Sequence, residues 1–480
     1  MENRRTFVKK MGWTAGALSL LGISPVLSWD SIVTRSKPIR IKGRVVSSGK
    51  GLSKIVVSDG VTVTSTDHNG HFDFWSIAQQ PFVFLSIPSG YTLNQLSNGS
   101  ASFFQPIDTS KEKNEFLFQL QKNEVSDDKH SLLLLADPQI QNEYEAGELL
   151  KTSTPDFIKT IKKLNDPNTF GVGCGDLVYD RLHLFEDYNK AIKATEIPFF
   201  QVIGNHDMDL DSRSDEATTR TFNRLFGPSY YSFNRGEIHY VVLDDVFFTG
   251  VEREYIGYIT ENQLAWLEQD LQYIEAGRTV VVCTHIPIAG GVKNKSHLYE
   301  LLAPYKVHIL SGHTHRNYNT FEENCFEHVH GAVCGAWWSG PICSDGTPNG
   351  YGVYQMSGSD LSWYYKAVDK PKTHQFRFYK RGANPEFPNS CSINIWNWNP
   401  NWNICWYENG NRNAHVRNVK TTDPLSTELH LGKKLPERRT WVEPASTDHM
   451  FFFEPSDHID EITIEVTDNF GNVYVETVNV

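Results

Sequence analysis

The chain has 480 residues, of which 39% are hydrophobic and 21% are charged, and its formal net charge is −12. This length is too great for one ordinary hydrophobic core, so two or three domains are expected, and the composition is that of a soluble globular protein rather than a disordered one. An acidic body argues against nucleic acid or an anionic membrane surface as the main partner.

The first 28 residues differ from the rest and have the pattern of an export signal. A basic segment, Arg4–Lys10, precedes a short apolar run, Trp13–Ile23, and its Arg-Arg-x-Phe-Val-Lys order resembles a twin-arginine signal. Val26 and Ser28 are small enough for a cleavage pair. We therefore predict a signal peptide over 1–28, a periplasmic or secreted protein, and no stable membrane anchor after signal removal. The alternative is a membrane-anchored N-terminal helix.

Residues 38–121 have the pattern of a small β-sandwich. Short alternating runs are separated by Asp59-Gly60 and Asn69-Gly70, dipeptides that favour tight hairpin turns. Helical periodicity is absent from this stretch. The polar segment 122–130 then indicates a linker.

From residue 131 the pattern changes to an alternation of strands and helices. Expected helices cover Pro155–Leu164, Leu184–Ala194 and Glu261–Glu275, the last with Thr260 and Gln263 as a capping box. The expected strands are the apolar runs Leu132–Ala136, Phe170–Cys174, Phe199–Ile203, Thr279–Cys283 and Val307–Leu310, with one hairpin, Tyr230–Phe233 and His239–Leu243, among them. Such alternation predicts an α/β domain, which we place at 131–345.

The helical pattern ends near residue 345, and an all-β domain is predicted over 360–480. Ser392–Trp398 with Trp402–Tyr407, and Glu461–Thr467 with Val473–Val478, are expected hairpins. The chain has seven cysteines. Cys334 with Cys343 and Cys391 with Cys405 flank short loops, so either pair could form a disulfide in an oxidising compartment.

Polar residues follow each of the five apolar runs of the middle domain. In α/β sheets ligands bind outside the carboxyl ends of the strands, so these residues are expected along one edge. Together they offer carboxylate, amide and imidazole ligands, a set that suits metal ions. The clusters are Asp137-Pro138-Gln139, Gly175-Asp176, Gly204-Asn205-His206-Asp207, Thr284-His285 and Gly312-His313-Thr314-His315.

This order of motifs resembles the calcineurin-like metallophosphoesterase family over roughly 131–345. The resemblance implies a four-layer α/β/β/α domain flanked by two sandwich-like β domains, similar to one group of exported bacterial phosphoesterases. It also implies two metal ions (Mn, Fe or Zn). The implied ligands are Asp137, Asp176 and His315 for one ion and Asp176, Asn205, His285 and His313 for the other. Gln139 stands where the family usually has histidine, which implies a looser first site.

The resemblance also implies the chemistry, which is hydrolysis of a phosphoric mono- or diester by a hydroxide that the two metals activate. His206 would be the general acid and Asp180 would orient it. Alternatively, Tyr179 could bind iron, as in purple acid phosphatases. A third interpretation is a non-catalytic surface or carbohydrate-binding protein with a vestigial metal domain.

Substrate recognition is expected from residues that follow the metal histidines. Arg316 could compensate the charge of a small phosphorylated substrate, and Tyr351 could contact it. The aromatics of Trp337-Trp338 could stack on a base or sugar, or could seal the contact with the C-terminal domain. The metal pair and the choice between mono- and diester stay open at this stage.

Overall fold

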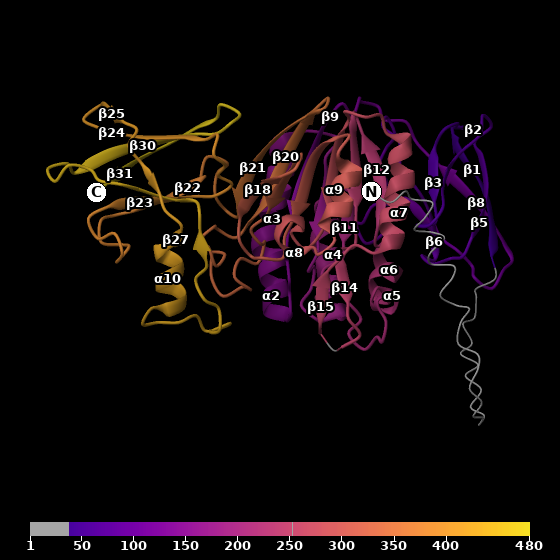
Figure 1. The fold of residues 1–480 in the computed structure, drawn as a ribbon, viewed down its shortest axis with the longest axis horizontal. Coiled ribbons are helices and arrows are strands. Elements are labelled where there is room, and N and C mark those ends of the chain that lie inside the picture. The colour runs from indigo at the N-terminus through magenta and orange to yellow at the C-terminus, as the bar shows by residue number, and fades with distance from the viewer. Residues whose placement is uncertain (1–37, 252) are drawn as a thin grey trace, which may run out of the picture. The chain divides into compact units, whose positions relative to one another are not determined.

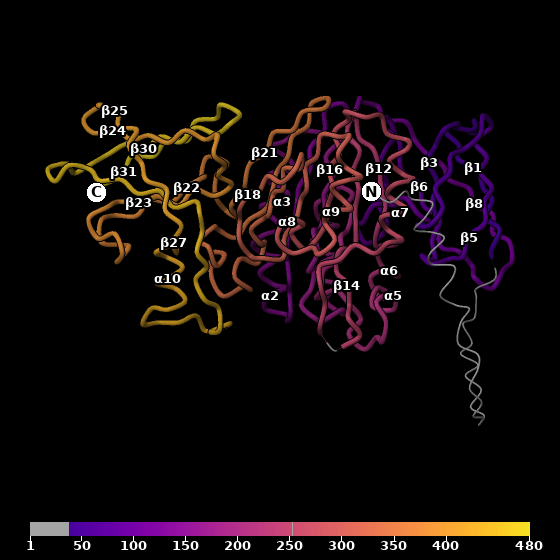
Figure 2. The backbone as a smooth tube through the Cα atoms, viewed as in Figure 1, coloured from indigo at the N-terminus to yellow at the C-terminus, as the bar shows by residue number. Residues whose placement is uncertain are grey.

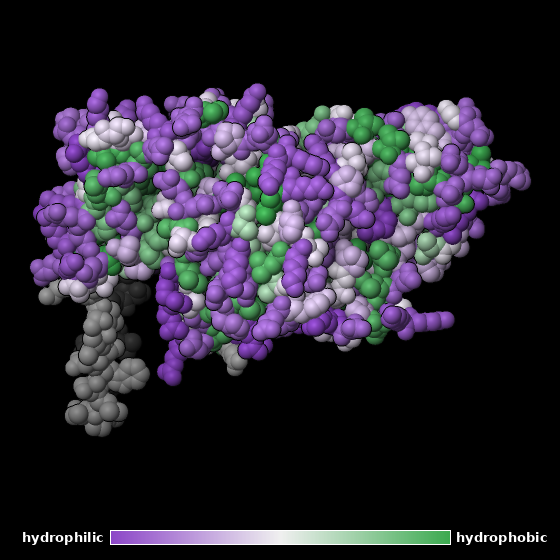
Figure 3. All heavy atoms as spheres, turned by 180° about the vertical axis from the view of Figure 1, so that it is seen from behind, coloured by the Kyte–Doolittle hydropathy of each residue, from purple (hydrophilic) through white to green (hydrophobic). Residues whose placement is uncertain are grey.

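The computed structural model describes residues 38–251 and 253–480, so the predicted signal peptide over 1–28 lies outside the described residues. Residues 38–480 form one compact unit. Figure 1 shows its strands and helices, and Figure 2 traces the same backbone as a tube. On the face shown in Figure 3, hydrophilic side chains cover most of the surface and hydrophobic residues gather in small patches. Within the described ranges, every helix is too short or too polar to cross a bilayer.

The N-terminal region consists of two four-stranded sheets. Side chains of the strand β5 alternate between exposed and buried along its whole length, so one face of its sheet is in solvent and the other is buried in the core. One sheet contains β1 (Ile39–Ser47), β2 (Lys50–Gly51), β5 (His71–Ser76) and β8 (Lys113–Gln119), and the other contains β3 (Val56–Ser58), β4 (Val63–Ser65), β6 (Phe82–Leu85) and β7 (Phe104–Pro106).

The middle region contains two larger sheets. The five-stranded sheet has the order β11 (Phe199–Val202), β10 (Phe170–Cys174), β9 (Lys129–Leu135), β20 (Gly350–Ser357) and β21 (Asp360–Ala367). The six-stranded sheet has the order β12 (Tyr231–Arg235), β13 (Ile238–Val242), β16 (Thr279–Cys283), β17 (Lys306–Ser311), β19 (Cys325–Val329) and β18 (Tyr318–Glu322). A short ribbon, β14 (Val246–Phe248) and β15 (Tyr255–Gly257), stands apart from both sheets.

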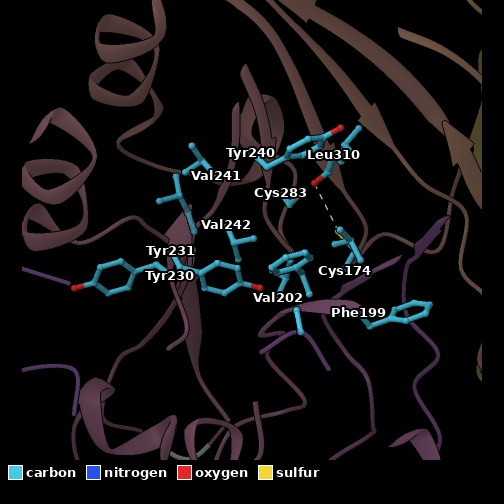
Figure 4. Packing of buried hydrophobic residues seen from close by; sticks show 14 of the residues in the cluster. Cys174, Phe199, Val202, Tyr230, Tyr231, Tyr240, Val241, Val242, Cys283 and Leu310 are labelled. Carbon is cyan, nitrogen blue, oxygen red and sulfur yellow. Dashed lines mark hydrogen bonds between the residues drawn. The ribbon is translucent and has the colours of Figure 1, made fainter. Parts of the chain in front are cut away.

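The two sheets pack face to face through buried aromatic and aliphatic side chains. Phe200 of β11 stacks on Phe233 of β12 at 3.7 Å between ring centroids. Cys174 Sγ of β10 lies 3.6 Å from the backbone oxygen of Leu310 in β17, as the dashed line in Figure 4 shows. Because both faces of these strands are covered, they appear in the sequence as continuous apolar runs.

Helices cover the outer faces of the two sheets (Figure 1). Tyr188 of α4 donates to Gln201 of β11, which ties that helix to the five-stranded sheet. The α-helices are α2 (Glu143–Glu148), α3 (Thr154–Leu164), α4 (Phe185–Lys193), α5 (Asp215–Thr218), α6 (Arg220–Phe226), α7 (Glu261–Asp270), α8 (Ile288–Gly291) and α9 (Lys295–Leu302). A π-helical turn, Leu149–Ser153, joins α2 to α3, and short 3-10 turns cover Leu182–Leu184 and Leu271–Tyr273.

The C-terminal region again contains two four-stranded sheets around its own hydrophobic core. One has the order β22 (Phe376–Tyr379), β23 (Cys391–Ile395), β29 (Met450–Phe453) and β26 (Arg417–Asn418), and the other β25 (Asn411–Asn413), β24 (Asn403–Glu408), β30 (Glu461–Thr467) and β31 (Val473–Asn479). A two-stranded ribbon, β27 (Thr421–Thr422) and β28 (Ser446–Thr447), and one helix, α10 (Pro424–Leu431), lie between these strands in the sequence. The mixed α/β middle region between sheet-rich regions confirms the predicted fold class.

Several details differ from the expectations. The expected hairpin of Ser392–Trp398 and Trp402–Tyr407 is wrong, because β23 and β24 belong to different sheets and the Asn399-Pro400-Asn401 corner carries the chain between them. The hairpin of β30 and β31 is confirmed.

The helix α10 was not predicted, although Asp423 caps it by accepting from the Ser426 amide. The strands β20 and β21 extend the middle sheet beyond residue 345. All seven cysteines are free.

Candidate metal centre

The predicted ligands lie at the carboxyl ends of strands from both middle sheets. Asp137, Asp176 and Asn205 follow β9, β10 and β11, which run parallel. His285 and His313 follow β16 and β17, which are also parallel. Since the sheets pack face to face with these ends at a shared edge, residues more than 100 positions apart in the sequence come into contact.

Three of these residues converge on one nitrogen of a fourth and form with it what we call the His285 half: Asp176, Asn205, His285 and His313. Nε2 of His285 lies 3.2 Å from Asn205 Oδ1, 3.2 Å from His313 Nδ1 and 3.3 Å from Asp176 Oδ1. The opposite nitrogen of His285, Nδ1, donates to the Cys174 carbonyl at 3.0 Å, so Nε2 is the nitrogen with the free lone pair. Acceptor atoms gathered in this way form a ligand set for a cation.

The other predicted ligands form the His315 half: Asp137, Gln139, Asp176 and His315. His315 Nδ1 donates to the Gly335 carbonyl at 2.6 Å, which leaves Nε2 as the lone-pair nitrogen. That Nε2 is buried without a hydrogen-bond partner and lies 3.5 Å from Asp137 Oδ1. The amide nitrogen of Gln139 donates to Asp176 Oδ2 at 2.8 Å, and the Gln139 amide oxygen is buried without a partner.

The burial and charge of these groups fit metal ions. Burial raises the pKa of the Asp137 carboxyl to about 8. Burial also lowers the pKa of His313 to about 3 and that of His315 to about 4, so both imidazoles are neutral and able to bind a metal. Burial opposes a charge on His285, but the neighbouring Asp176 carboxylate raises the pKa of His285 to about 10, so Nε2 faces a negative charge that either a proton or a metal ion would compensate. Buried carboxylates and lone pairs without hydrogen-bond partners are unfavourable unless a positive charge lies beside them, so a cation would stabilise this cluster.

The backbone around the centre is strained and tightly packed. A Cβ on Gly175, whose φ is +78°, would lie 2.3 Å from His285 Nδ1, and a Cβ on Gly312 would lie 2.5 Å from Asp137 Oδ2. Only glycine allows these close approaches, which explains the glycines before Asp176 and His313. Left-handed backbone conformations, which cost energy in residues other than glycine, occur at Asp137, Gln139, Asp176, Asp180, His313 and His315.

The predicted general acid lies next to the shared carboxylate. His206 Nδ1 donates to Asp180 Oδ1 at 2.7 Å, and the His206 backbone amide donates to Asp176 Oδ1 at 2.9 Å. Burial lowers the pKa of His206, but the carboxylates of Asp176 and Asp180 outweigh it, so that the pKa is raised overall. The ring of Tyr179 stacks on the His206 ring at 4.0 Å between centroids. His206 is therefore held on three sides.

The two predicted substrate contacts differ in their surroundings. Arg316 is half-buried, its guanidinium lies 5.8 Å from the centre of the Tyr318 ring, and it has no ion pair within the described ranges. Tyr351 corrects the prediction. It is fully buried, and its hydroxyl lies 3.0 Å from Asp156 Oδ2 and 2.7 Å from Thr160 Oγ1 of α3. It belongs to the packing between α3 and β20, because both partners of its hydroxyl lie in α3.

Two carboxylates that the sequence interpretation did not assign hold the loops of the centre. Asp207 accepts from the backbone amides of Leu177, Val178 and Gly204, and so joins the loops after β10 and β11. Asp245 accepts from the backbone amide of His285 at 3.1 Å. Both residues follow apolar strands. An acidic residue shortly after a strand was therefore the signal in the sequence that could have identified them.

Comparisons with known proteins match this architecture in three consecutive parts. Residues 39–123 match the family model described as the N terminal of Calcineurin-like phosphoesterase, residues 130–317 match Calcineurin-like phosphoesterase, and residues 327–474 match the C terminal of Calcineurin-like phosphoesterase. The chain belongs to the calcineurin-like phosphoesterase family.

Curated relatives include the serine/threonine-protein phosphatase CPPED1 of two mammals. The Mus musculus protein is 31% identical over 145 residues, which cover 28% of this chain and 45% of that protein. The Homo sapiens protein is 27% identical over 188 residues, which cover 34% of this chain and 59% of that protein. The chain thus spans about half the length of the curated relatives it matches.

Two similar solved structures have low sequence identity. One is purple acid phosphatase PPD1 from yellow lupin, with 14% identity and a TM-score of 0.38, covering 64% of this chain and 56% of that chain. Another is GAP50, the anchor in the inner membrane complex of Plasmodium, with 14% identity and a TM-score of 0.36, covering 50% of this chain and 85% of that chain.

Proposed function

We propose that this chain hydrolyses phosphoric esters at the candidate metal centre, with two ions of Mn, Fe or Zn as cofactors. The observation that carries the proposal is the convergence of three ligand atoms within 3.3 Å of His285 Nε2, with His206 bonded to the same Asp176 carboxylate. Ligands for cations and a candidate proton donor are thereby joined through one side chain.

The residues present fit two ions that share Asp176. The His285 half would hold one ion, and the His315 half would hold the other. When bound, such ions lower the pKa of water and neutralise phosphoryl oxygens. Arg316, half-buried and unpaired within the described ranges, follows His315 directly and would add a positive charge for the phosphoryl group.

His206 would deliver the proton that the leaving group needs. Asp180 accepts a hydrogen bond from Nδ1, which fixes the ring and leaves Nε2 as the nitrogen that would give its proton to the departing oxygen. The bond from the His206 amide to Asp176 keeps this ring beside the shared carboxylate. No side chain of the protein has to form a covalent bond with phosphorus in this scheme.

The ring stack favours this role for Asp180 over binding of iron by Tyr179. Tyr179 stacks flat on His206 with 23° between the ring planes, and burial followed by the charge of Asp180 raises the pKa of its phenol. The intact cluster and the family membership also favour an enzyme over a non-catalytic binding protein.

We propose a small phosphorylated molecule as the substrate. The relatives carry the name of protein phosphatases, but in this chain a segment of the C-terminal region lies against the centre. Arg439 of that segment donates to Glu145 of α2 at 2.8 Å. Such cover leaves less room for a folded protein substrate than for a small ester.

The test is hydrolysis of p-nitrophenyl phosphate and bis-p-nitrophenyl phosphate by the purified chain, with analysis of bound metal. His206→Ala should lower turnover of an alkyl ester such as glycerol 2-phosphate at least about a hundredfold while metal content stays unchanged, because general acids contribute about 10²–10⁴ in rate and an alkoxide needs the proton more than p-nitrophenolate does. His458→Ala is the matched control, since His458 is exposed in the C-terminal region. The ratio of the two rates separates monoesterase from diesterase. Absence of both turnover and bound metal after supplementation with Mn, Fe and Zn would overturn the proposal.

We also propose that the protein acts outside the cytoplasm. The support is the sequence of residues 1–28 alone, with paired Arg4 and Arg5 before an apolar run. Replacement of both arginines by lysine should retain the precursor inside the cell. Normal export of that variant would exclude the twin-arginine route.

A further inference from the structure

A segment of the C-terminal region reaches the candidate metal centre. This segment, residues 432–445 between α10 and β28, is called the strap here. Arg439 of the strap pairs with Glu145 of α2 at 2.8 Å, with the two side chains only 16% and 1% exposed. At the end of the strap, the Ala445 amide donates to the Ser344 carbonyl at 2.8 Å. The strap is therefore fixed on the middle region at two separate points.

Two residues of the strap contact aromatic rings that stack on predicted functional histidines. The guanidinium of Arg439 lies 5.4 Å from the centre of the Tyr179 ring, which stacks on His206. The ring centroids of Trp441 and Trp337 lie 4.7 Å apart. Trp337 in turn stacks on His315, with 4.0 Å between the ring centroids and 15° between the ring planes. The strap thus touches both sides of the centre through one intermediate ring each.

The tryptophan side carries an exposed aromatic side chain. Trp441 is 55% exposed and Trp337 is partly buried, whereas the neighbouring Trp338 is buried and donates from Nε1 to the Pro138 carbonyl. Trp338 therefore seals the packing. Trp337 and Trp338 both have left-handed backbones, with φ of 53° and 59°, so exposure and contacts rather than the backbone distinguish the two residues. Trp337 thus lies between His315 and the exposed indole of Trp441, and an exposed indole is a typical contact for a planar group.

We propose that Trp337 and Trp441 form a subsite for a planar aromatic ring of the phosphoric ester, and that Trp441 determines specificity. The inference rests on the proposed function and narrows its substrate class to esters with an aryl group or a nucleoside base. Arg439 is a positioning residue, because its ion pair with Glu145 fixes the strap two positions before Trp441. The C-terminal region would thereby take part in the choice of substrate.

The experiment compares esters with and without a ring. In wild type and Trp441→Ala, kcat and KM are measured for phenyl phosphate, a nucleoside 5′-monophosphate and glycerol 2-phosphate. Loss of one aromatic contact should lower kcat/KM for a ring-bearing ester about five- to tenfold, mainly through KM, with little change for glycerol 2-phosphate. A larger loss of kcat/KM for phenyl phosphate would indicate a site for an aryl group, and a larger loss for the nucleoside 5′-monophosphate would indicate a site for a base.

Two further variants make the result specific. Trp441→Phe keeps a ring and should restore most of the preference, while Trp75→Ala removes a tryptophan that is 61% exposed on β5 and should change nothing. Quenching of tryptophan fluorescence by phenylphosphonate, with methylphosphonate as its ringless counterpart, reports binding without turnover. An unchanged ratio of ring-bearing to ringless esters in active Trp441→Ala would overturn the inference. Absence of turnover in wild type would instead contradict the proposed function.

Discussion

The two halves of the candidate metal centre are preorganised to different degrees. In the His285 half, three ligand atoms lie within 3.3 Å of one imidazole nitrogen. In the His315 half, the corresponding nitrogen of His315 has Asp137 Oδ1 at 3.5 Å, and Gln139 points its amide nitrogen at Asp176. The ligands of one half already converge, whereas those of the other half are partly engaged with each other.

The difference follows from the chemistry of the side chain at position 139. A neutral imidazole fixed by a hydrogen bond at one nitrogen offers only a lone pair at the other. A carboxamide offers both an acceptor and two donors, and here the amide nitrogen donates one hydrogen bond to the Asp176 carboxylate. The Gln139 oxygen is left for a cation, but the amide nitrogen occupies an oxygen of the carboxylate that both halves would share.

The largest expected effect comes from the residue that belongs to both halves. Asp176→Asn should remove both ions and lower turnover about a thousandfold or more, because each half loses its shared negative ligand. Metal analysis and p-nitrophenyl phosphate hydrolysis measure the two consequences. Asp360→Asn, at an exposed position on β21, is the control. Retention of both ions with turnover within tenfold of wild type would refute a shared role for Asp176.

A second effect should separate the halves. His315→Ala should retain about one equivalent of metal after dialysis, whereas His285→Ala should lose both, because the compact half supports the shared carboxylate. In the wild-type chain, a chelator should correspondingly remove the ions in two steps. The measurement is metal content against chelator concentration for all three proteins. If His315→Ala lost both ions and His285→Ala kept one, the assignment of the tighter half would be reversed.

A third change should make the halves more alike. Gln139→His replaces the carboxamide by an imidazole, which has no NH₂ group to hold the Asp176 carboxylate. The affinity of the His315 half for a metal ion should therefore rise about tenfold. The chelator concentration that removes the more weakly held ion should increase accordingly. Gln121→His adds a histidine at an exposed position and controls for non-specific binding. An unchanged chelation profile would show that Gln139 does not limit the affinity.

The strands that carry the centre were predictable from sequence because they are buried on both faces. The runs Phe170–Cys174 and Thr279–Cys283 coincide with β10 and β16, since continuous apolar stretches ending in polar residues mark parallel strands. The capped helix after Thr260 begins as predicted at Glu261 but ends at Asp270 rather than Glu275, and the 3-10 turn Leu271–Tyr273 follows it. Local patterns thus identified the elements that position the ligands.

Long-range features could not be derived from such patterns. Neither the sheet change at Asn399-Pro400-Asn401 nor the docking of Trp441 against Trp337 has a local signature, because alternation along a strand does not specify which distant strand it pairs with. The burial of Tyr351 was missed for the same reason, since its partner Thr160 lies in α3. The bond of Gln139 to Asp176 depends on where another strand ends.

The smallest expected effect concerns Tyr179, the residue that would complete the His315 half in a purple-acid-type enzyme. Tyr179→Phe keeps the ring that stacks on His206 and removes only the hydroxyl, so turnover should stay within about twofold of wild type, the scale of a minor packing change. The iron-loaded wild-type chain should also lack a tyrosinate–iron absorption band. Tyr144→Phe is the matched control, because that ring is 49% exposed and contacts Arg438 of the strap. A coloured iron form whose band disappears in Tyr179→Phe would instead assign the phenol to the metal and make the His315 half as complete as its neighbour.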